Sequence, residues 1–381
     1  MDDANQRDRG GIDFTSTYAD LEATPQADGS FSKEQLWRFI WDLQLEPDWR
    51  SEAELDNAFY DGDQLDQPTL IKMRDNGMLP VVNNVVGATV DSVVGLEVIT
   101  RSDLRCLPEN EESFEVAMAM NVKFKEATRM TRFGHHVGMQ FKQMCKQGIG
   151  WMEVSRNPDP FEYPYRNAAI DWRQMYVDHR ARAHDYEDKR YLIRRNWFDG
   201  DVLLRYFPNK EHQRIIKNAT SGLDMNWLLI GEELGHHDLA AARAMHLSQE
   251  MRFTLEEDEW RQQLRGRVPL YEILYYVPLP VEVIMLNSGH VITLDRKSDL
   301  HLEILRSKKG YYRKGVTKQW RQAFYVSSER LTDRPLRTNR PHYIPMVGYR
   351  KDNDGSPYGI IRRMRSPQDN LPKHTLSLIH I

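Results

Sequence analysis

Cysteine is scarce in this chain of 381 residues. Its two cysteines, Cys106 and Cys145, are too few for a disulfide framework or a four-thiolate zinc site. This scarcity favours a reducing, cytoplasmic setting. The sequence also has no run of about 18 apolar residues, so it predicts no membrane-spanning helix. The first residues are acidic and polar, which is unlike a secretory signal.

The motifs of common catalytic classes are missing as well. Gly310 and Gly315 have the spacing of a phosphate loop, but Val316 stands where that loop requires lysine. No Gly-x-Ser-x-Gly nucleophile turn occurs. The pairs His135–His136 and His236–His237 would point about 100° apart on a helix, so neither pair can chelate one metal. We therefore expect no catalytic residue, no metal and no cofactor.

One constellation offers an alternative function. Asp178 follows a β-type run, and Glu187 and Lys189 stand in a Glu-x-Lys string shortly after it. Two-metal nucleases use an Asp and a Glu-x-Lys on adjacent strands to hold Mg²⁺ and to position the attacking water. The alternative interpretation of these residues is an ordinary charged hairpin, because such a string is common by chance.

What the chain does contain is aromatic and unevenly charged. Nine Trp, 17 Tyr and 13 Phe exclude a wholly disordered chain. The net charge of −4 is unevenly distributed along the chain. Residues 1–68 carry five Lys/Arg against seventeen Asp/Glu, a net −12, whereas residues 296–373 carry nineteen against seven, a net +12. This polarity indicates that one end meets a polyanion or an acidic partner, unless it is only a lopsided solvated surface.

Helical patterns dominate the first 150 residues. We expect a mobile acidic tail over residues 1–30, a helix that Ser32 caps with Gln35, and a second helix that ends at Asp61-Gly62. Spacing does not decide between a strand and a buried helix for the apolar residues 79–99. The clearest helix is predicted over residues 113–147. We expect its apolar face to be core rather than a partner surface; it consists of Phe114, Met118, Val122, Met130, Phe133, Val137, Phe141 and Met144.

From Trp151 the pattern favours strands. A short helix is expected over residues 199–207 and a helical insert over about 223–264, while the proline-rich last seventy residues are expected to be mostly irregular. The β-type runs are residues 151–154, 175–177, 191–193, 271–277, 281–286, 291–294 and 322–326.

The strongest physical signal is a basic stretch near residues 306–321. Tyr311, Tyr312 and Trp320 are interleaved with its cations, which can neutralise phosphates while aromatic rings stack bases or pack locally. No base-reading motif accompanies it, so DNA binding here would be independent of sequence. The alternative is that these cations dock on the acidic region of a neighbouring subunit. The cations are Arg306, Lys308, Lys309, Arg313, Lys314, Lys318 and Arg321.

Several ordered segments carry a family resemblance over about residues 36–370. Taken together, they resemble the portal (head-to-tail connector) proteins of tailed bacteriophages of the short-tailed type. Two departures are His179, where the family has proline, and Pro372, which intrudes where the family continues into a long stem helix. The matching segments are AFYDGDQ at 58–64, GMLP at 77–80, VNNVV at 82–86, VDSVVG at 90–95, GIGWMEV at 148–154, DYEDKRY at 185–191, IPMVG at 344–348, DGSPYG at 354–359 and SPQ at 366–368.

The resemblance implies a structural protein of the virion, assembled in the host cytoplasm, and not an enzyme. It would form a dodecameric homo-oligomer at one capsid vertex and pass double-stranded DNA through its channel. Its further partners would be the terminase large subunit and the capsid, scaffold and tail adaptor proteins, with no membrane involved. The resemblance also places Asp178 and the Glu187–Lys189 string in a segment without a catalytic role, which weakens the nuclease alternative.

An α+β fold of portal type follows from the pattern and the resemblance together. We expect a helical wing or hip section over 31–150, a β-rich wing with its helical insert over 151–305, and a basic clip and stem-entry section over 306–381. The last six residues, LSLIHI, are largely apolar and lack a cap. We interpret this ending as a truncated reading frame with a non-native tail.

Overall fold

The computed structural model divides the chain into two compact units. The small unit comprises residues 1–40 and 277–319, and the large unit comprises residues 41–276 and 320–381. Nearly all of the predicted acidic tail, and the whole predicted helix at 223–264, lie outside the described residues. The structure describes residues 30–65, 67–77, 82–102, 105–108, 110–157, 159–220, 267–287, 290–294, 298–307, 310–326, 329–338 and 340–379.

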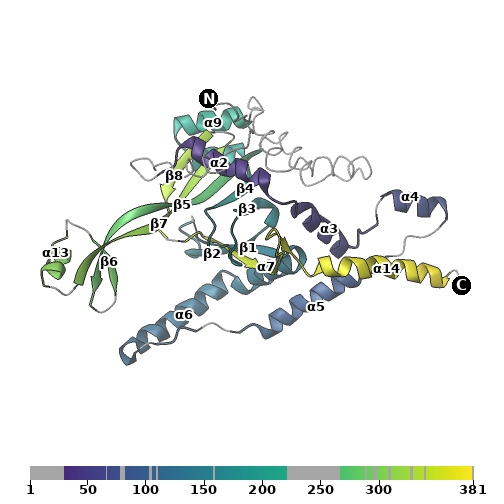
Figure 1. Cartoon of the computed structure of the whole chain (residues 1–381), viewed down its shortest axis with the longest axis horizontal. Helices are drawn as coiled ribbons and strands as arrows, with labels where there is room; N and C mark the ends of the chain where they lie inside the picture. The colour runs from purple at the N-terminus through teal and green to yellow at the C-terminus, as the bar shows by residue number, and fades with distance from the viewer. Residues whose placement is uncertain are drawn as a thin grey trace, which may run out of the picture. The chain divides into compact units, whose positions relative to one another are not determined.

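A three-stranded antiparallel sheet of order β2-β1-β9 lies in the large unit (Figure 1). Trp151 of the central strand is only 1% exposed, and it lies opposite Ile170 on one side and Pro345 on the other. Helix α7 packs against this sheet. The elements are α7 (Phe133–Gln147), β1 (Ile149–Arg156), β2 (Tyr165–Ile170) and β9 (Tyr343–Val347).

Two glycines permit close approaches where α7 joins β1. Gly148 ends α7 with φ 89°, a left-handed conformation that disfavours other residues. A Cβ atom at Gly148 would collide with the backbone of Tyr358, and one at Gly150 would collide with the carbonyl oxygen of Gln140. The Gly-x-Gly-Trp segment therefore has a steric origin.

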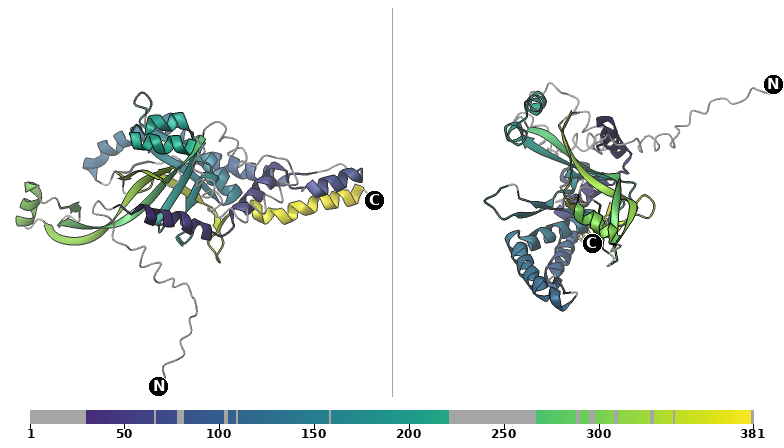
Figure 2. Two further views of the ribbon diagram at one scale, coloured as in Figure 1. Left: turned by 90° about the horizontal axis from the view of Figure 1, so that it is seen from above. Right: turned by 90° about the vertical axis from the view of Figure 1, so that its left-hand side faces the viewer.

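A larger sheet has the strand order β3-β4-β5-β7-β8, with β6 paired to β5. Figure 2 shows the long neighbouring strands β5 and β7, both of which run through the two units of the chain. The predicted β-type runs fall within β1, β3, β4, β5, β6 and β7, to within one residue. The strands are β3 (Met175–Val177), β4 (Tyr191–Asp199), β5 (Arg267–Leu286), β6 (Val291–Thr293), β7 (Gly310–Val326) and β8 (Glu329–Pro335).

Aromatic residues fill the core that both sheets share in the large unit. The rings of Trp49 and Trp172 lie 5.4 Å apart, and Leu192 and Leu274 of the larger sheet join the same cluster. A second cluster forms where two helices cover the larger sheet, with Leu203 buried at 1% exposure. These helices are α8 (Gly200–Tyr206), as predicted, and α9 (Lys210–Thr220).

Three further helices pack with α7 in a third core of the large unit. Phe59, Val90 and Ile361, one from each of them, are buried together with Cys145 of α7. The apolar segment that spacing left undecided is therefore largely a helix. The expectation of an irregular C-terminal region broken at Pro372 is wrong, because the last helix continues through this proline; proline removes one hydrogen bond but keeps a helical φ. The helices are α3 (Arg50–Asp61), α5 (Val85–Thr100) and α14 (Ile361–Ile379).

Several short helices and strands lie near the two ends of the described chain, and two of their end signals were predicted from the sequence. The predicted capping box is confirmed: the Gln35 N–H donates to Ser32 Oγ (3.2 Å), and the Ser32 N–H donates to Gln35 Oε1 (2.8 Å). Gly62 ends α3 in the left-handed conformation, as the Asp61-Gly62 pair predicted. The remaining short elements here are α2 (Lys33–Asp42), a 3-10 turn (Leu43–Leu45), α4 (Gln67–Asp75), β10 (Tyr349–Arg350) and β11 (Pro357–Tyr358).

The single helix expected over residues 113–147 is in fact two helices. Helix α6 (Phe114–Met130) is capped by Thr131. Helix α7 starts after Arg132, whose φ of 51° is left-handed. A non-glycine residue in this conformation turns the chain abruptly, and apolar spacing carries no signal for such a turn. Figure 1 shows α6 and α7 meeting at this junction.

The small unit holds the distal half of β5, strand β6, helix α13 (Asp299–Arg306) and the first half of β7. Val283 lies opposite Thr293 in the β5–β6 pair. The Tyr312 hydroxyl of β7 donates to Glu282 of β5 (2.8 Å) and so helps to hold these strands together. Among the described residues, no helix combines the length and apolarity that crossing a bilayer requires.

Candidate nucleic-acid and subunit interface

The predicted basic stretch divides between the two units. Arg306 ends α13, and Arg313, Lys314 and Lys318 lie on the first half of β7; all four side chains are exposed. Lys308 and Lys309 lie outside the described residues. Beside these cations, Tyr311 and Tyr312 are 56% and 42% exposed. The small unit therefore presents cations and aromatic rings along one strand.

Arg321 and Trp320 do not belong to this exposed stretch. Arg321 is 5% exposed, and its Nε lies 2.9 Å from Asp333 Oδ1 on the neighbouring strand β8. Trp320 is 6% exposed and packs edge-on against Tyr276. The prediction that Arg321 contacts a partner is therefore wrong, because β7 passes into the sheet at this point and its guanidinium neutralises an internal carboxylate.

Much of the described acidic region is neutralised within the chain. Arg365 of α14 donates to Glu52 Oε2 (2.6 Å) and to Asp56 Oδ1 (2.7 Å) of α3. Arg173 forms two hydrogen bonds of 2.6 Å with Glu54. The net −12 of residues 1–68 is therefore not a free negative surface over α3, because cations from distant segments take up these carboxylates.

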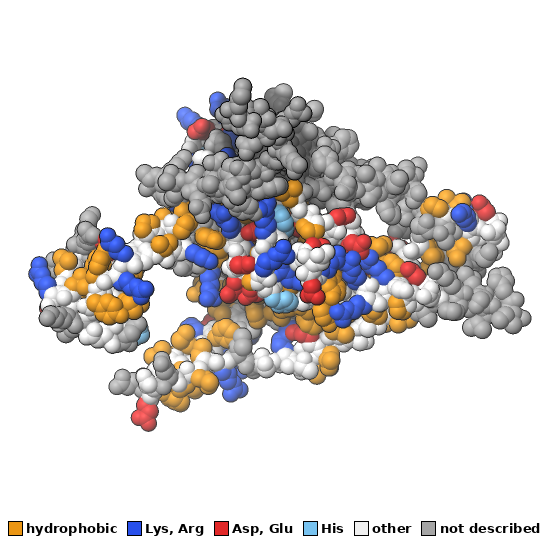
Figure 3. Space-filling view, in the orientation of Figure 1, with side chains coloured by type: hydrophobic (Ala, Val, Ile, Leu, Met, Phe, Trp, Pro, Cys, Tyr) orange, Lys and Arg blue, Asp and Glu red, His pale blue; other side chains and the backbone are white. Residues whose placement is uncertain are grey.

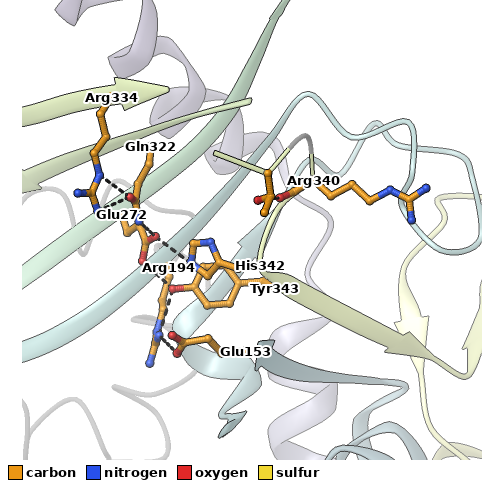
Figure 4. Close-up of polar contacts among 9 residues, drawn as sticks. Glu153, Arg194, Glu272, Gln322, Arg334, Arg340, His342 and Tyr343 are labelled. Carbon is orange, nitrogen blue, oxygen red and sulfur yellow. Dashed lines mark hydrogen bonds and ion pairs between the residues drawn. The ribbon is translucent and has the colours of Figure 1, made fainter. Parts of the chain in front are cut away.

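A buried polar network connects the two sheets of the large unit (Figure 4). Glu272 of β5 is 8% exposed; its carboxylate accepts from Gln322 Nε2 of β7 (2.5 Å) and from the Tyr343 hydroxyl of β9 (2.6 Å). His342 Nε2 lies 3.2 Å from Glu272 Oε1. Burial alone would raise the pKa of Glu272, but the hydrogen bonds from His342, Tyr343 and Gln322 hold it below its ordinary value.

Further strands extend this network. Arg334 of β8 donates twice to Gln322 Oε1, at 2.9 and 2.8 Å. Arg194 of β4 donates to Glu153 of β1 (2.8 Å) and to the Tyr343 hydroxyl (3.1 Å). Sequence reasoning missed this network, although one signal was available: Glu272 is a single charge within the apolar β-type run 271–277.

The residues of the nuclease alternative hold a turn together. The Asp178 carboxylate accepts the backbone N–H groups of Arg180 (3.0 Å) and Arg190 (3.1 Å). Lys189 is 7% exposed and its Nζ donates to the Tyr186 carbonyl (2.9 Å), while Glu187 is exposed. Both oxygens of Asp178 are thus bonded to the backbone, and the lysine is directed into a turn. This arrangement matches the charged-hairpin interpretation, and nothing in it supports metal-dependent hydrolysis.

Asp42, Asp178 and His179 bring ligand-type atoms within 4.8 Å of one another. However, Arg180 Nη2 lies 3.0 Å from Asp42 Oδ1, and the Tyr191 hydroxyl donates to Asp42 Oδ2 (2.8 Å). A guanidinium already supplies the positive charge that these carboxylates require. The cluster is therefore explained as an internal ion pair.

Only one of the two histidine pairs lies among the described residues. His136 Nδ1 accepts the Ala169 N–H (3.3 Å), and burial lowers the pKa of His136. This bond satisfies His136 within the chain. The pair His236–His237 lies outside the described residues.

The apolar face expected to be core is exposed on α6. Phe114, Met118, Val122 and Met130 are 52–66% exposed, whereas Phe133, Val137, Phe141 and Met144 of α7 are half-buried. Hydrophobic side chains gather over α6 in Figure 3. The prediction of an internal core is wrong for α6, because apolar spacing marks one face of a helix without showing which surface, if any, of its own chain covers that face.

Comparison with known proteins gives this chain a family. A family model described as phage P22-like portal protein matches residues 36–381. No curated protein matches the chain. Portals of this kind are structural virion components that form a homo-oligomeric ring and work with the phage packaging machinery. The chain therefore belongs to the P22-like portal proteins, the structural subunits of the bacteriophage head-to-tail connector that serves DNA packaging.

Proposed function

We propose that twelve copies of this chain form a ring at a single capsid vertex. The ring assembles in the host cytoplasm, docks the terminase large subunit during packaging and later binds the tail adaptors. It also contacts capsid and scaffold proteins, and double-stranded DNA passes through its channel in packaging and ejection. The observation that carries this proposal is the family match over residues 36–381. The subunit is not an enzyme, so hydrolysis of ATP belongs to the terminase.

We propose three sections of the chain. Residues 31–150 form the wing or hip, residues 151–305 form the β-rich wing, and residues 306–381 form the clip and the entry to the stem. Residues 223–264, predicted from the sequence as a helical insert, are proposed to belong to the wing. Hydrogen exchange of the assembled ring tests these boundaries, because contact sections gain protection on assembly.

The mass of the purified chain in solution is the first test. Native mass spectrometry is expected to give a species of twelve subunits, and negative-stain images are expected to show a ring with a central channel. A chain that stays monomeric at every concentration would contradict the proposal. It would instead favour a monomeric nucleic-acid-binding module.

The exposed cations of the small unit are proposed to contact DNA. Arg306, Arg313, Lys314 and Lys318 are exposed beside Tyr311, which suits phosphate binding without base reading. If these four cations engage four phosphates, log affinity is expected to fall against log salt with a slope of about −4.

A double variant tests this contact. Arg313→Ala with Lys314→Ala is expected to flatten the salt slope by about two, equally for different DNA sequences. The matched control replaces Lys210 and Lys217, two exposed lysines of α9, and should leave the slope unchanged. If the Arg313 and Lys314 variant keeps its DNA affinity but loses self-association in sedimentation, these cations contact a neighbouring subunit instead.

A further inference from the structure

Helix α6 has two apolar stripes that its own chain leaves uncovered. One stripe consists of Phe114, Met118 and Val122, which are 54–66% exposed. The other consists of Val116, Met120 and Phe124, which are 41–60% exposed. Each stripe has i, i+4 spacing, and a step of two residues turns a helix by about 200°, so the stripes lie on nearly opposite sides.

The chain itself covers only a narrow side of α6. Ala117 is 7% exposed, and Asn121 forms two hydrogen bonds with the backbone of Cys106, at 2.7 and 3.0 Å. These residues lie between the two stripes on the helical circle. The internal contacts of α6 therefore leave both stripes open to a partner.

The exposed apolar surface continues into the segment that precedes α6. Eleven large apolar side chains of α6 and of the residues before it are 41–86% exposed. Extensive exposed apolar surface on a soluble protein is typical of protein–protein interaction sites. The side chains are Leu96, Val98, Ile99, Leu107, Phe114, Val116, Met118, Met120, Val122, Phe124 and Met130.

The charges on α6 exclude two other kinds of partner. It carries charges of both signs, with Glu115 and Glu126 against Lys123, Lys125 and Arg129, and Lys123 pairs with Glu126 at 3.1 Å. DNA requires a surface of one positive sign, which α6 does not offer. A helix that lies on a lipid surface has one apolar face opposite one strongly charged face, whereas α6 has two apolar stripes.

We infer that the two stripes of α6, with the end of α5, contact neighbouring copies of this chain. The inference rests on the proposed ring. In a closed ring every subunit has a neighbour on each side, and the two contacts use different surfaces of the subunit. A helix with apolar stripes on opposite sides meets this requirement, because both stripes are covered when it lies between two protein surfaces.

Glutamine substitutions on each stripe test the inference. The variants are Val116→Gln with Met120→Gln, and Met118→Gln with Val122→Gln. The control is Glu115→Gln with Ala119→Gln, which places the same side chains at exposed positions of the same helix, in the sector between the two stripes and away from Ala117. Each stripe variant is expected to raise the concentration for half-assembly at least tenfold in sedimentation velocity, with the control within twofold of wild type. Helical content by circular dichroism should be equal in all three.

A crosslinking experiment does not depend on how the variants fold. A photoreactive amino acid at Met120 of the full chain is expected to give a covalent dimer on illumination, and one at the exposed Glu187 is not. If wild type forms rings, the stripe variants assemble equally well and Met120 gives no dimer, the inference is overturned and the stripes belong to another partner. If wild type never assembles, the proposed function itself fails, and the inference fails with it.

Discussion

The buried carboxylate of Asp56 makes the stability of this protein depend on pH in a predictable direction. Asp56 lies on α3, its side chain is 3% exposed, and Arg365 of α14 donates to it at 2.7 Å. Burial raises the pKa of Asp56 from 3.8 to about 6, and the hydrogen bond and charge of Arg365 offset only part of this rise.

The sign and size of the effect follow from proton linkage. Because the pKa is higher in the folded state, the folded protein binds this proton more tightly than the unfolded chain does. The contribution of Asp56 to stability is therefore greatest below pH 3.8 and declines as the pH rises through about 6. A rise of about two pKa units corresponds to about 3 kcal/mol.

The substitution Asp56→Asn isolates this contribution, because Asn keeps an acceptor for Arg365 but does not titrate. We expect the free energy of unfolding of wild type, relative to the variant, to fall by about 2.4 kcal/mol between pH 4 and pH 7. The assay is urea denaturation followed by tryptophan fluorescence, at a protein concentration low enough to prevent self-association.

An exposed carboxyl provides the control. Glu187→Gln should leave the difference from wild type nearly constant over the same pH range, since Glu187 is exposed. If the difference between wild type and Asp56→Asn stayed flat, or increased with pH, the reasoning from burial would be refuted.

Three further substitutions test the packing by urea denaturation. Gly150→Ala should cost more than about 2 kcal/mol, because its Cβ would meet the Gln140 carbonyl, and a loss below about 0.5 kcal/mol would contradict that contact. Phe141→Ala should cost about 1–2 kcal/mol, less than the 3–5 kcal/mol of a fully buried Phe, because Phe141 is half-buried. Arg321→Met should cost up to about 3 kcal/mol because it removes the nearer of two cations from the buried Asp333 carboxylate, which keeps the Tyr275 hydroxyl and the more distant Arg330; an unchanged midpoint would show that the pair is dispensable.

Sequence patterns predicted the local elements well where local forces decide. The capping box at Ser32 and Gln35 and the turn at Gly62 depend on side chains and backbone angles within one turn, so they are readable from neighbouring residues. The β-type run at 191–193 was also found, because branched and aromatic residues mark a pleated surface.

Predictions failed where a distant partner decides. Arg321 seemed to belong to a basic stretch, yet Asp333 on the next strand neutralises it. The apolar spacing of residues 114–130 predicted a core face, yet these side chains are exposed, because the pattern alone does not say which surface covers a helix. Glu272 draws its bonds from β7 and β9, which are distant in sequence, so only the assembled sheets reveal its role.

The bonds around Glu272 have a consequence for geometric accuracy. Apolar sheets can slide over one another at little cost, but a buried carboxylate with fixed donors on β7 and β9 is satisfied in one alignment of the two sheets. In a closed ring, an angular error in one subunit is repeated in every copy and accumulates around the circumference. We expect this carboxylate to fix the angle between the two sheets. Every copy then has the same shape, and the last subunit of the ring meets the first.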